Sequence, residues 1–503
     1  MKLNFTFLFL CGFTLLIISC SKEPLNDSNR LSFDPNSSSI PEGSFSSNFA
    51  STPQPGEGYN EYEENPFVLT SDEPLTTFSI DADGGSYANV RHFLEDGQFP
   101  PSAAVRTEEI MNFFQYEYQN PTSSHPISLN GEITSCPWTP SNRLLRIGLK
   151  GKEIARVDMP PANFVFLVDV SGSMRSDDKL GLLKEGFSIY TDYMRPEDKI
   201  AIVTYGGEAS VPLHSTSGAN KTTIKAAIAQ MSAGGGTNGE GGIIKAYEIA
   251  QANFINGGNN RVILGTDGDF NVGVSSQDDL VTLIEEKRES GVFLSVLGVG
   301  SGNYQDGKME QLANNGNGNY EYIDDIEQAQ KIFVDEFGKF YTVAKDVKIQ
   351  VNFDPNNVYQ YRLIGYENRA LDNEDFLDDT KDAGEIGVGQ SITALYEFTP
   401  VNTFNFSIPV SNINFRYKQP DSDASQNLSL NVFDQNIPFQ AASENTRFAI
   451  SAAGFGLMLQ DSEYKGNLTW DHLLQWADQA KSFDPNGYRA EFLTWIQKAK
   501  EFE

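Results

Sequence analysis

Two hydroxyl residues and a carboxylate alternate in the middle of this chain. Asp169, Ser171 and Ser173 come directly after an uninterrupted apolar run over residues 164–168. Such a run predicts a buried strand, so the three side chains should emerge together at its carboxyl end. Hard divalent cations prefer oxygen ligands, and magnesium takes six of them in near-octahedral array. This spacing therefore predicts a divalent-cation site, favouring magnesium and leaving calcium and manganese open.

Two more oxygen donors follow other predicted elements. Thr237 lies in the glycine-rich stretch 234–239, and Asp267 ends a second apolar strand over residues 261–266. Each stands after one element and before a helix, as the binding loops of an α/β sheet do. Glycines beside Thr237 allow close approach of the backbone to an ion. We therefore expect Thr237 and Asp267 to complete the site.

Catalysis is an alternative use of the same ion, because a bound cation can activate water for hydrolysis. The chain has four histidines, none of them inside a recognisable motif, and it has neither a phosphate-binding loop nor a G-x-S-x-G elbow. Residues 81–85, Asp-Ala-Asp-Gly-Gly, hint at a calcium loop. The twelfth position of that loop is His92, where an EF-hand needs glutamate. We interpret that segment as a strand-to-helix turn, and we predict that the protein is not an enzyme.

These motifs resemble a known site. The D-x-S-x-S run, the loop threonine and the Thr-Asp-Gly triplet at 266–268 are similar to the metal-ion-dependent adhesion site of von Willebrand factor A domains. Stretches at 198–206, 260–273, 294–304 and 363–369 are similar to the bacterial YfbK-type lipoproteins, and the likeness runs from about Phe67 to the end of the chain.

The resemblance implies a role for each position. Ser171, Ser173 and Thr237 would bind the ion directly through their hydroxyls, and Asp169 and Asp267 would act largely through water. An open coordination position would accept a carboxylate from the Asp or Glu of a protein partner, whose identity the resemblance does not supply. A scaffold in which the metal is purely structural is the alternative within the binding class.

The rest of the sequence predicts the strands and helices that must position these residues. Residues 161–344 alternate apolar strands with amphipathic helices, which predicts an α/β fold with a doubly wound, mainly parallel sheet, as in von Willebrand factor A domains. The predicted strands lie at 164–168, 199–203, 261–264, 292–297 and 320–323. Residues 66–160 predict a small α+β domain, and residues 345–503 predict a β-rich segment followed by helices.

The start of the chain predicts export. An apolar run over residues 5–18 leads into Ile17-Ile18-Ser19-Cys20, which resembles the lipobox of bacterial lipoproteins. Residues 1–19 would be the signal peptide, Cys20 the lipidated residue, and 20–65 a flexible tether poor in apolar residues. An uncleaved anchor helix or an ordinary signal peptide is the alternative. We expect a lipid-anchored protein of the cell envelope. The outer membrane is favoured over the inner membrane, and both the periplasmic face and the surface face stay open.

The net charge argues against one class of partner, and the cysteine content argues against a disulfide bond. The chain has 37 Lys and Arg against 68 Asp and Glu, a formal net charge of −31. Such a field repels nucleic acid, so no nucleic-acid partner is expected, although acidic surfaces also serve solubility. Of three cysteines, Cys11 would leave with the signal peptide and Cys20 would carry lipid. Cys136 then has no disulfide partner, and we predict a small buried residue there.

Overall fold

The computed structural model describes residues 58–81, 83–269, 277–302 and 304–503. The predicted signal peptide, Cys20 and most of the predicted tether lie outside the described residues. Within these ranges, none of the helices has both the length and the apolar character needed to span a membrane.

A six-stranded sheet forms the centre of the domain that carries the predicted metal site. Its order is β10-β9-β8-β5-β6-β7, and every neighbouring pair is parallel except β6 and β7. The strands are β5 (Ala162–Asp169), β6 (Lys199–Tyr205), β7 (Ala209–Ser217), β8 (Asn259–Thr266), β9 (Phe293–Val299) and β10 (Tyr320–Ile323). This confirms the predicted doubly wound, mainly parallel α/β fold.

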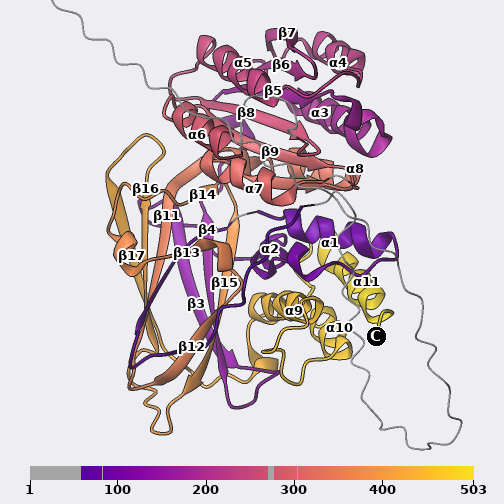
Figure 1. The fold of residues 1–503 in the computed structure, drawn as a ribbon. Coiled ribbons are helices and arrows are strands. Elements are labelled where there is room, and N and C mark those ends of the chain that lie inside the picture. Colours follow the sequence, from indigo (N-terminus) through magenta and orange to yellow (C-terminus); the bar gives the residue numbers. More distant parts are fainter. Residues whose placement is uncertain (1–57, 82, 270–276, 303) are drawn as a thin grey trace, which may run out of the picture. The chain divides into compact units, whose positions relative to one another are not determined.

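Alternation along β5 explains why helices cover both faces of this sheet (Figure 1). Phe164, Phe166 and Val168 belong to one buried core, whereas Val165 and Leu167 belong to a second core on the opposite face. The first core is shared with α3 (Leu182–Tyr193), α4 (Lys221–Gln230) and α8 (Ile326–Gln330). The second is shared with α5 (Gly239–Ala252), α6 (Gln277–Arg288) and α7 (Asp306–Asn315). Burial on both faces is what the continuous apolar runs predict.

The segments before and after the central domain build two further sheets together. Their orders are β1-β12-β15-β4-β3 and β13-β2-β11-β16-β17, with β14 paired to β11. In these sheets β2 pairs with β11 and β4 pairs with β15, so each sheet contains strands from both before and after the central domain. The sequence analysis describes these two segments separately, and the structure joins them by hydrogen bonds.

The strands of these two sheets come from both segments. Those before the central domain are β1 (Val68–Leu69), β2 (Leu75–Ser79), β3 (Ile127–Ser135) and β4 (Arg143–Gly151). Those after it are β11 (Thr342–Phe353), β12 (Val358–Ile364), β13 (Ala370–Leu371), β14 (Gly384–Gly387), β15 (Ser391–Pro400), β16 (Ser411–Lys418) and β17 (Ser425–Val432).

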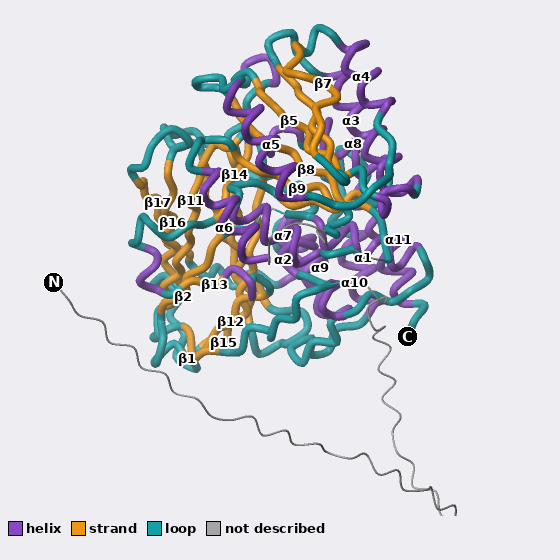
Figure 2. Tube along the Cα trace, turned by 45° about the horizontal axis from the view of Figure 1, so that its top comes forward, coloured by secondary structure: helices purple, strands orange, loops and turns teal. Residues whose placement is uncertain are grey.

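Helices from the same two segments pack on each other, as Figure 2 shows for α1, α2, α9 and α11. They are α1 (Gly85–Glu95), α2 (Thr107–Asn112), α9 (Glu444–Leu459), α10 (Trp470–Asp478) and α11 (Tyr488–Lys500). Edge-to-face and tilted aromatic contacts join α9 and α11 to the segment that follows α2. The ring of Phe114 lies 4.9 Å from that of Phe448 and 5.2 Å from that of Phe492, between centroids. Such pairs add to the free energy gained by burying the rings.

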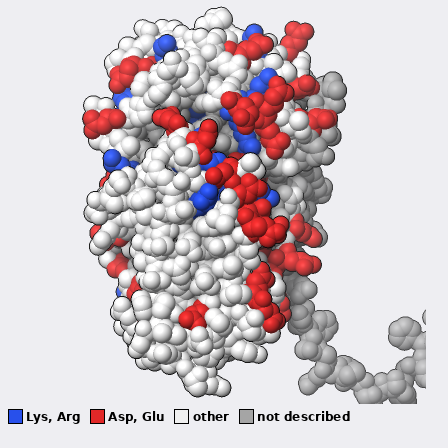
Figure 3. Space-filling view, turned by 90° about the vertical axis from the view of Figure 1, so that its left-hand side faces the viewer, with Lys and Arg blue, Asp and Glu red and all other residues white. Residues whose placement is uncertain are grey.

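Two expectations about surface and core can be checked directly. Asp and Glu side chains gather in patches over the face shown in Figure 3, where Lys and Arg are fewer, as the net charge of −31 requires. Cys136 is buried and makes no disulfide, which confirms the predicted buried residue. Burial, together with the carboxylate of Glu397, raises the pKa of the Cys136 thiol far above its usual range.

Candidate metal centre

Adjacent parallel strands bring the two predicted aspartates to one edge of the central sheet. β5 ends at Asp169, β8 ends at Thr266, and Asp267 follows directly. The two strands are in parallel register, with Val168 opposite Gly265. The Thr266 hydroxyl donates to Oδ2 of Asp169 at 3.0 Å, which ties the two strand ends together. Asp169 and Asp267 therefore lie side by side at the carboxyl end of the sheet.

Backbone hydrogen bonds hold the glycine-rich loop of Thr237 against the loop that follows β5. The N–H of Gly234 donates to the carbonyl of Val170 at 2.7 Å, and the N–H of Gly172 donates to the carbonyl of Gly235 at 3.2 Å. Thr237 itself is buried, at 8% exposure. A Cβ at Gly206 would lie 3.1 Å from the Gly234 carbonyl oxygen, so a larger residue there would push this loop away. The structure thus places Thr237 in the loop that packs on Ser171 and Ser173.

The spacing of the two serine hydroxyls fits a shared ion. Oγ of Ser171 lies 3.0 Å from Oγ of Ser173. Two ligands at right angles around one magnesium ion, each about 2.1 Å from it, lie about 3.0 Å apart. The hydroxyl pair therefore matches one edge of an octahedral coordination sphere. This match tests the fit of the donor set, and the assignment of each ligand stays a prediction.

Asp169 is fully buried, and both of its oxygens accept hydrogen bonds. Oδ1 accepts from the N–H of Ser171 at 2.8 Å, and Oδ2 accepts from Thr266. Burial, with a smaller contribution from the carboxylate of Asp267, raises the pKa of Asp169 to about 6, although the hydrogen bonds of Ser171 and Thr266 act to lower it. A carboxylate already engaged in this way is suited to reach an ion through water. This arrangement agrees with the role that the resemblance implies.

Asp267 is held in the same manner, by one neighbour that the sequence analysis missed. Its Oδ1 accepts from the N–H of Asp269 at 3.2 Å, and its Oδ2 lies 3.1 Å from Nζ of Lys179. Lys179 is 6% exposed and Asp267 is fully buried. Lys179 lies in the short segment between α3 and the loop that carries Ser171 and Ser173, here called the metal loop. A lysine at such a position is easily taken for an exposed surface residue. Only its fixed distance in sequence from the D-x-S-x-S run could have identified it.

A second group of carboxylates lies elsewhere and is here called the junction cluster. It consists of Asp81, Glu109 and Glu310, whose oxygens lie within 4.8 Å of one another, together with Arg106 and Arg369. Such a group of carboxylates could hold a metal ion. The two arginines already supply positive charge, because Arg106 pairs with Glu109 and Arg369 lies 2.8 Å from Asp81. The turn predicted at residues 81–85 lies in the same place. Oδ1 of Asp81 accepts a hydrogen bond from the N–H of Asp83 at 2.8 Å.

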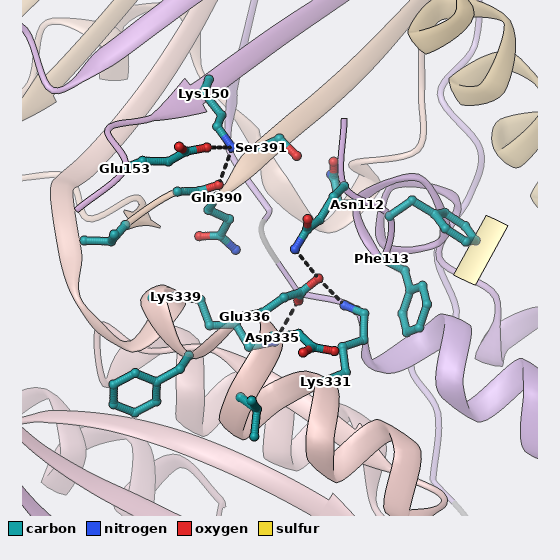
Figure 4. A pocket seen from close by; sticks show the side chains of 18 of the residues that line it. Asn112, Phe113, Lys150, Glu153, Lys331, Asp335, Glu336, Lys339, Gln390 and Ser391 are labelled. Carbon is teal, nitrogen blue, oxygen red and sulfur yellow. Dashed lines mark hydrogen bonds and ion pairs between the residues drawn. The ribbon is translucent and has the colours of Figure 1, made fainter. Parts of the chain in front are cut away.

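A partly open pocket of about 310 Å³ (Figure 4) is lined by none of the predicted ligands. Its wall includes Lys331, Glu336 and Lys339, and none of the four histidines lines it. Nζ of Lys331 lies 2.5 Å from Glu336, and Lys339 pairs with both Glu336 and Glu321. The charges drawn in Figure 4 therefore largely neutralise one another.

Comparison with known proteins now identifies the family. Residues 163–335 match the model of the von Willebrand factor type A domain, residues 53–146 a model described as von Willebrand factor, and residues 338–502 the C-terminal model of the uncharacterized protein YfbK. The chain is 42% identical over 466 residues to the uncharacterized protein YfbK of Escherichia coli (strain K12), covering 88% of this chain and 80% of that protein. The chain belongs to the YfbK family. A von Willebrand factor type A domain indicates protein–protein interaction in this family, and such domains often bind a divalent cation.

The solved structures that are similar to this YfbK family member have low sequence identity to it. A von Willebrand factor type A protein from Catenulispora acidiphila is 16% identical with a TM-score of 0.43, covering 76% of this chain and 91% of that chain. The conserved hypothetical protein BatB from Bacteroides thetaiotaomicron is 22% identical with a TM-score of 0.30, covering 36% of this chain and 98% of that chain. The fold assignment depends on the family model and on the strand order described above.

Proposed function

We propose that the central domain holds a divalent cation, magnesium in the first place, and uses it to bind a protein partner. Ser171, Ser173 and Thr237 would supply hydroxyl ligands, with Asp169 and Asp267 acting through water. A bound cation would supply an electrophilic position for the carboxylate of an Asp or Glu of the partner. The single observation that carries this proposal is the 3.0 Å spacing of the two serine hydroxyls, which fits one octahedral edge.

The surroundings of these hydroxyls suit a partner arriving from solvent. Thr237 is buried, but the neighbouring Gly235 and Gly236 are exposed and Ser173 is partly exposed. The predicted ligands therefore lie just beneath the surface, where a partner's side chain can reach them. A purely structural ion would not need such access. This exposure favours the binding function over the scaffold.

Binding is also favoured over metal-assisted hydrolysis. Hydrolysis needs a general base close to the activated water. The two carboxylates of the predicted ligand set are both engaged, Asp169 by Ser171 and Thr266, and Asp267 by Lys179. We therefore propose a non-enzymatic role.

The experiment that tests this function is capture of partners from the parent cell's envelope, with magnesium and with EDTA. Thr237→Val removes the hydroxyl while keeping the shape of the side chain, and at least one partner should be lost from this variant and from the EDTA sample alike. Ser176→Ala is the matched control, because Ser176 is exposed next to the metal loop and its side chain makes no capping bond. Equal capture with EDTA, or by Thr237→Val, would favour the scaffold and contradict the proposal.

We also propose that the protein is exported and anchored by lipid on Cys20, in the cell envelope and on the outer rather than the inner membrane. The support is the lipobox-like sequence that ends at Cys20 and the polar stretch that follows it. Cys20→Ala should abolish partition into detergent and remove the lipid mass from the N-terminal peptide. Unchanged partition together with an unchanged peptide mass would refute the anchor.

A further inference from the structure

Lys179 reaches the predicted metal centre through its contact with Asp267. It lies in a one-turn π-helix, η4 (Asp177–Gly181), between the metal loop and α3. Its ammonium reaches Oδ2 of Asp267 at 3.1 Å, and the side chains of both residues are buried. Wide helical turns of this kind are frequent at functional sites. The turn directs this lysine toward the neighbouring strand end rather than toward solvent.

A glycine makes room for this lysine. Gly300 follows β9 with a φ of +77°, and a Cβ there would lie 2.3 Å from Cε and 2.4 Å from Cγ of Lys179. The aliphatic part of Lys179 therefore crosses directly over Gly300. The hydroxyl of Tyr322 donates to the Gly300 carbonyl at 3.1 Å and fixes this backbone. A buried ammonium held by such packing is a permanent feature of the site.

The charges of the centre show what this ammonium does. Asp169 and Asp267 bring two negative charges to the predicted ligand set, and Lys179 brings one positive charge. In a buried site, charges a few ångströms apart interact far more strongly than in water. Without Lys179, the two carboxylates alone would neutralise a divalent cation. With Lys179, a net positive charge remains at the position that faces a partner.

We infer that Lys179 is a fixed counter-charge, which weakens the hold of the centre on its cation and strengthens the hold of the bound cation on a partner's carboxylate. This inference rests on the proposed function and names the residue that sets the balance between the two affinities. Lys179 is a positioning and charge-setting residue rather than a ligand. A merely structural lysine would change stability without shifting the two affinities in opposite directions.

The test measures both affinities on the full chain, with manganese as the ion and acetate as the carboxylate probe. Manganese binding is followed by its electron paramagnetic resonance signal, and acetate binding by the broadening of its methyl proton resonance in the manganese-loaded protein. Lys179→Met should bind manganese at least about tenfold more tightly and acetate several-fold more weakly than the parent. Lys179→Arg, which keeps the charge, should remain within about threefold of the parent for both probes.

A control variant and a second measurement distinguish a failure of this inference from a failure of the proposed function. Lys184→Met is the matched control, because Nζ of Lys184 donates to the carbonyls of Ala229 and Met231, away from the predicted ligands, and should change neither affinity. If Lys179→Met unfolds without metal, its affinity is taken from the manganese dependence of its melting temperature. Unchanged or weaker manganese binding by a folded Lys179→Met overturns this inference and leaves the proposed function intact. Absence of manganese binding by the parent chain overturns the proposed function itself.

Discussion

The predicted metal centre and the junction cluster both gather buried carboxylates, but they differ in the other side chains that they contain. At the metal centre, Asp169 and Asp267 stand beside hydroxyl residues, with one lysine at the margin and exposed glycines above. At the junction cluster, Asp81, Glu109 and Glu310 stand beside two arginines, the buried Arg106 and the partly buried Arg369. The first region offers neutral hydroxyl ligands near the surface. In the second region, arginine side chains already supply positive charge beside the carboxylates.

On the proposed assignment of the ion to the hydroxyl site, the proximity of carboxylates alone is a poor guide to a cation site. Guanidinium groups form charge-assisted hydrogen bonds with carboxylates and take up the positions that an ion would need. The junction cluster instead joins parts of the chain that are distant in sequence. Arg106, just before α2, pairs with Asp306 at the start of α7, and Arg369 lies after β12. We interpret it as an ion-pair network that holds α7 to the flanking segments.

The largest expected effect comes from breaking that network. Arg106→Met leaves Glu109, Asp306 and Glu310 buried without their main counter-charge, and loss of one partner of a buried pair costs about 3–5 kcal/mol. The free energy of unfolding, measured with denaturant, should fall by that amount, while manganese affinity stays within about twofold of the parent. Arg416→Met, which breaks a half-exposed pair with Asp379, should cost about 1 kcal/mol or less. Loss of manganese binding in Arg106→Met would contradict the separation of the two regions.

The next effect is specific to the metal centre. Ser171→Ala/Ser173→Ala removes both hydroxyls of the 3.0 Å pair. A cation at a hundredfold excess over its dissociation constant should stabilise the parent by about 2.7 kcal/mol, because it binds only the folded state. The double variant should lose nearly all of this shift in melting temperature. Full retention of the shift would show that the ligand set is wrong.

The smallest effect distinguishes the two regions by pH. Burial raises the pKa of Glu109 to about 8, and it also raises the pKa values of Asp83, Glu108 and Glu310. The folded state therefore holds more protons than the unfolded state between about pH 5 and 8, so stability is greatest at the lower end and falls as pH rises through that range. We expect a loss of at least about 1 kcal/mol from pH 6 to 9 in denaturant melts without metal.

Substitution at the junction cluster should reduce that pH dependence. Glu109→Gln removes one of the groups that bind protons on folding, so the slope of stability against pH should become smaller. Glu95→Gln is the control, because Glu95 is exposed on α1 and should leave the slope unchanged. A parent protein whose stability rises with pH over this range would contradict the assignment of bound protons to this cluster.

The sequence predicted the central domain well, because its signals are local. Continuous apolar runs over β5 and β8 located the strands, and their ends located Asp169 and Asp267. The edge strand β7 was not predicted, because its residues are mostly exposed or half-buried and it pairs antiparallel with β6. The strong signals belong to strands that are buried on both faces.

What the sequence could not show depends on contacts between distant residues. The pairing of β2 with β11 joins residues about 270 positions apart, such as Ser79 and Lys348. The hydrophobic pattern of a strand does not indicate which other strand it will pair with. The Arg106–Asp306 pair and the Lys179–Asp267 pair are of the same kind. Charged residues are usually exposed, and only the assembled fold shows that these are buried.

The central claim is that the ion lies among hydroxyls at the end of β5 rather than among carboxylates at the junction. The most direct measurement is an anomalous difference map from crystals of the protein soaked in manganese. The account predicts a peak about 2.1–2.3 Å from the hydroxyl oxygens of Ser171 and Ser173, with Lys179 still paired to Asp267. A map that is empty there, or that has its peak between Asp81, Glu109 and Glu310, would contradict it.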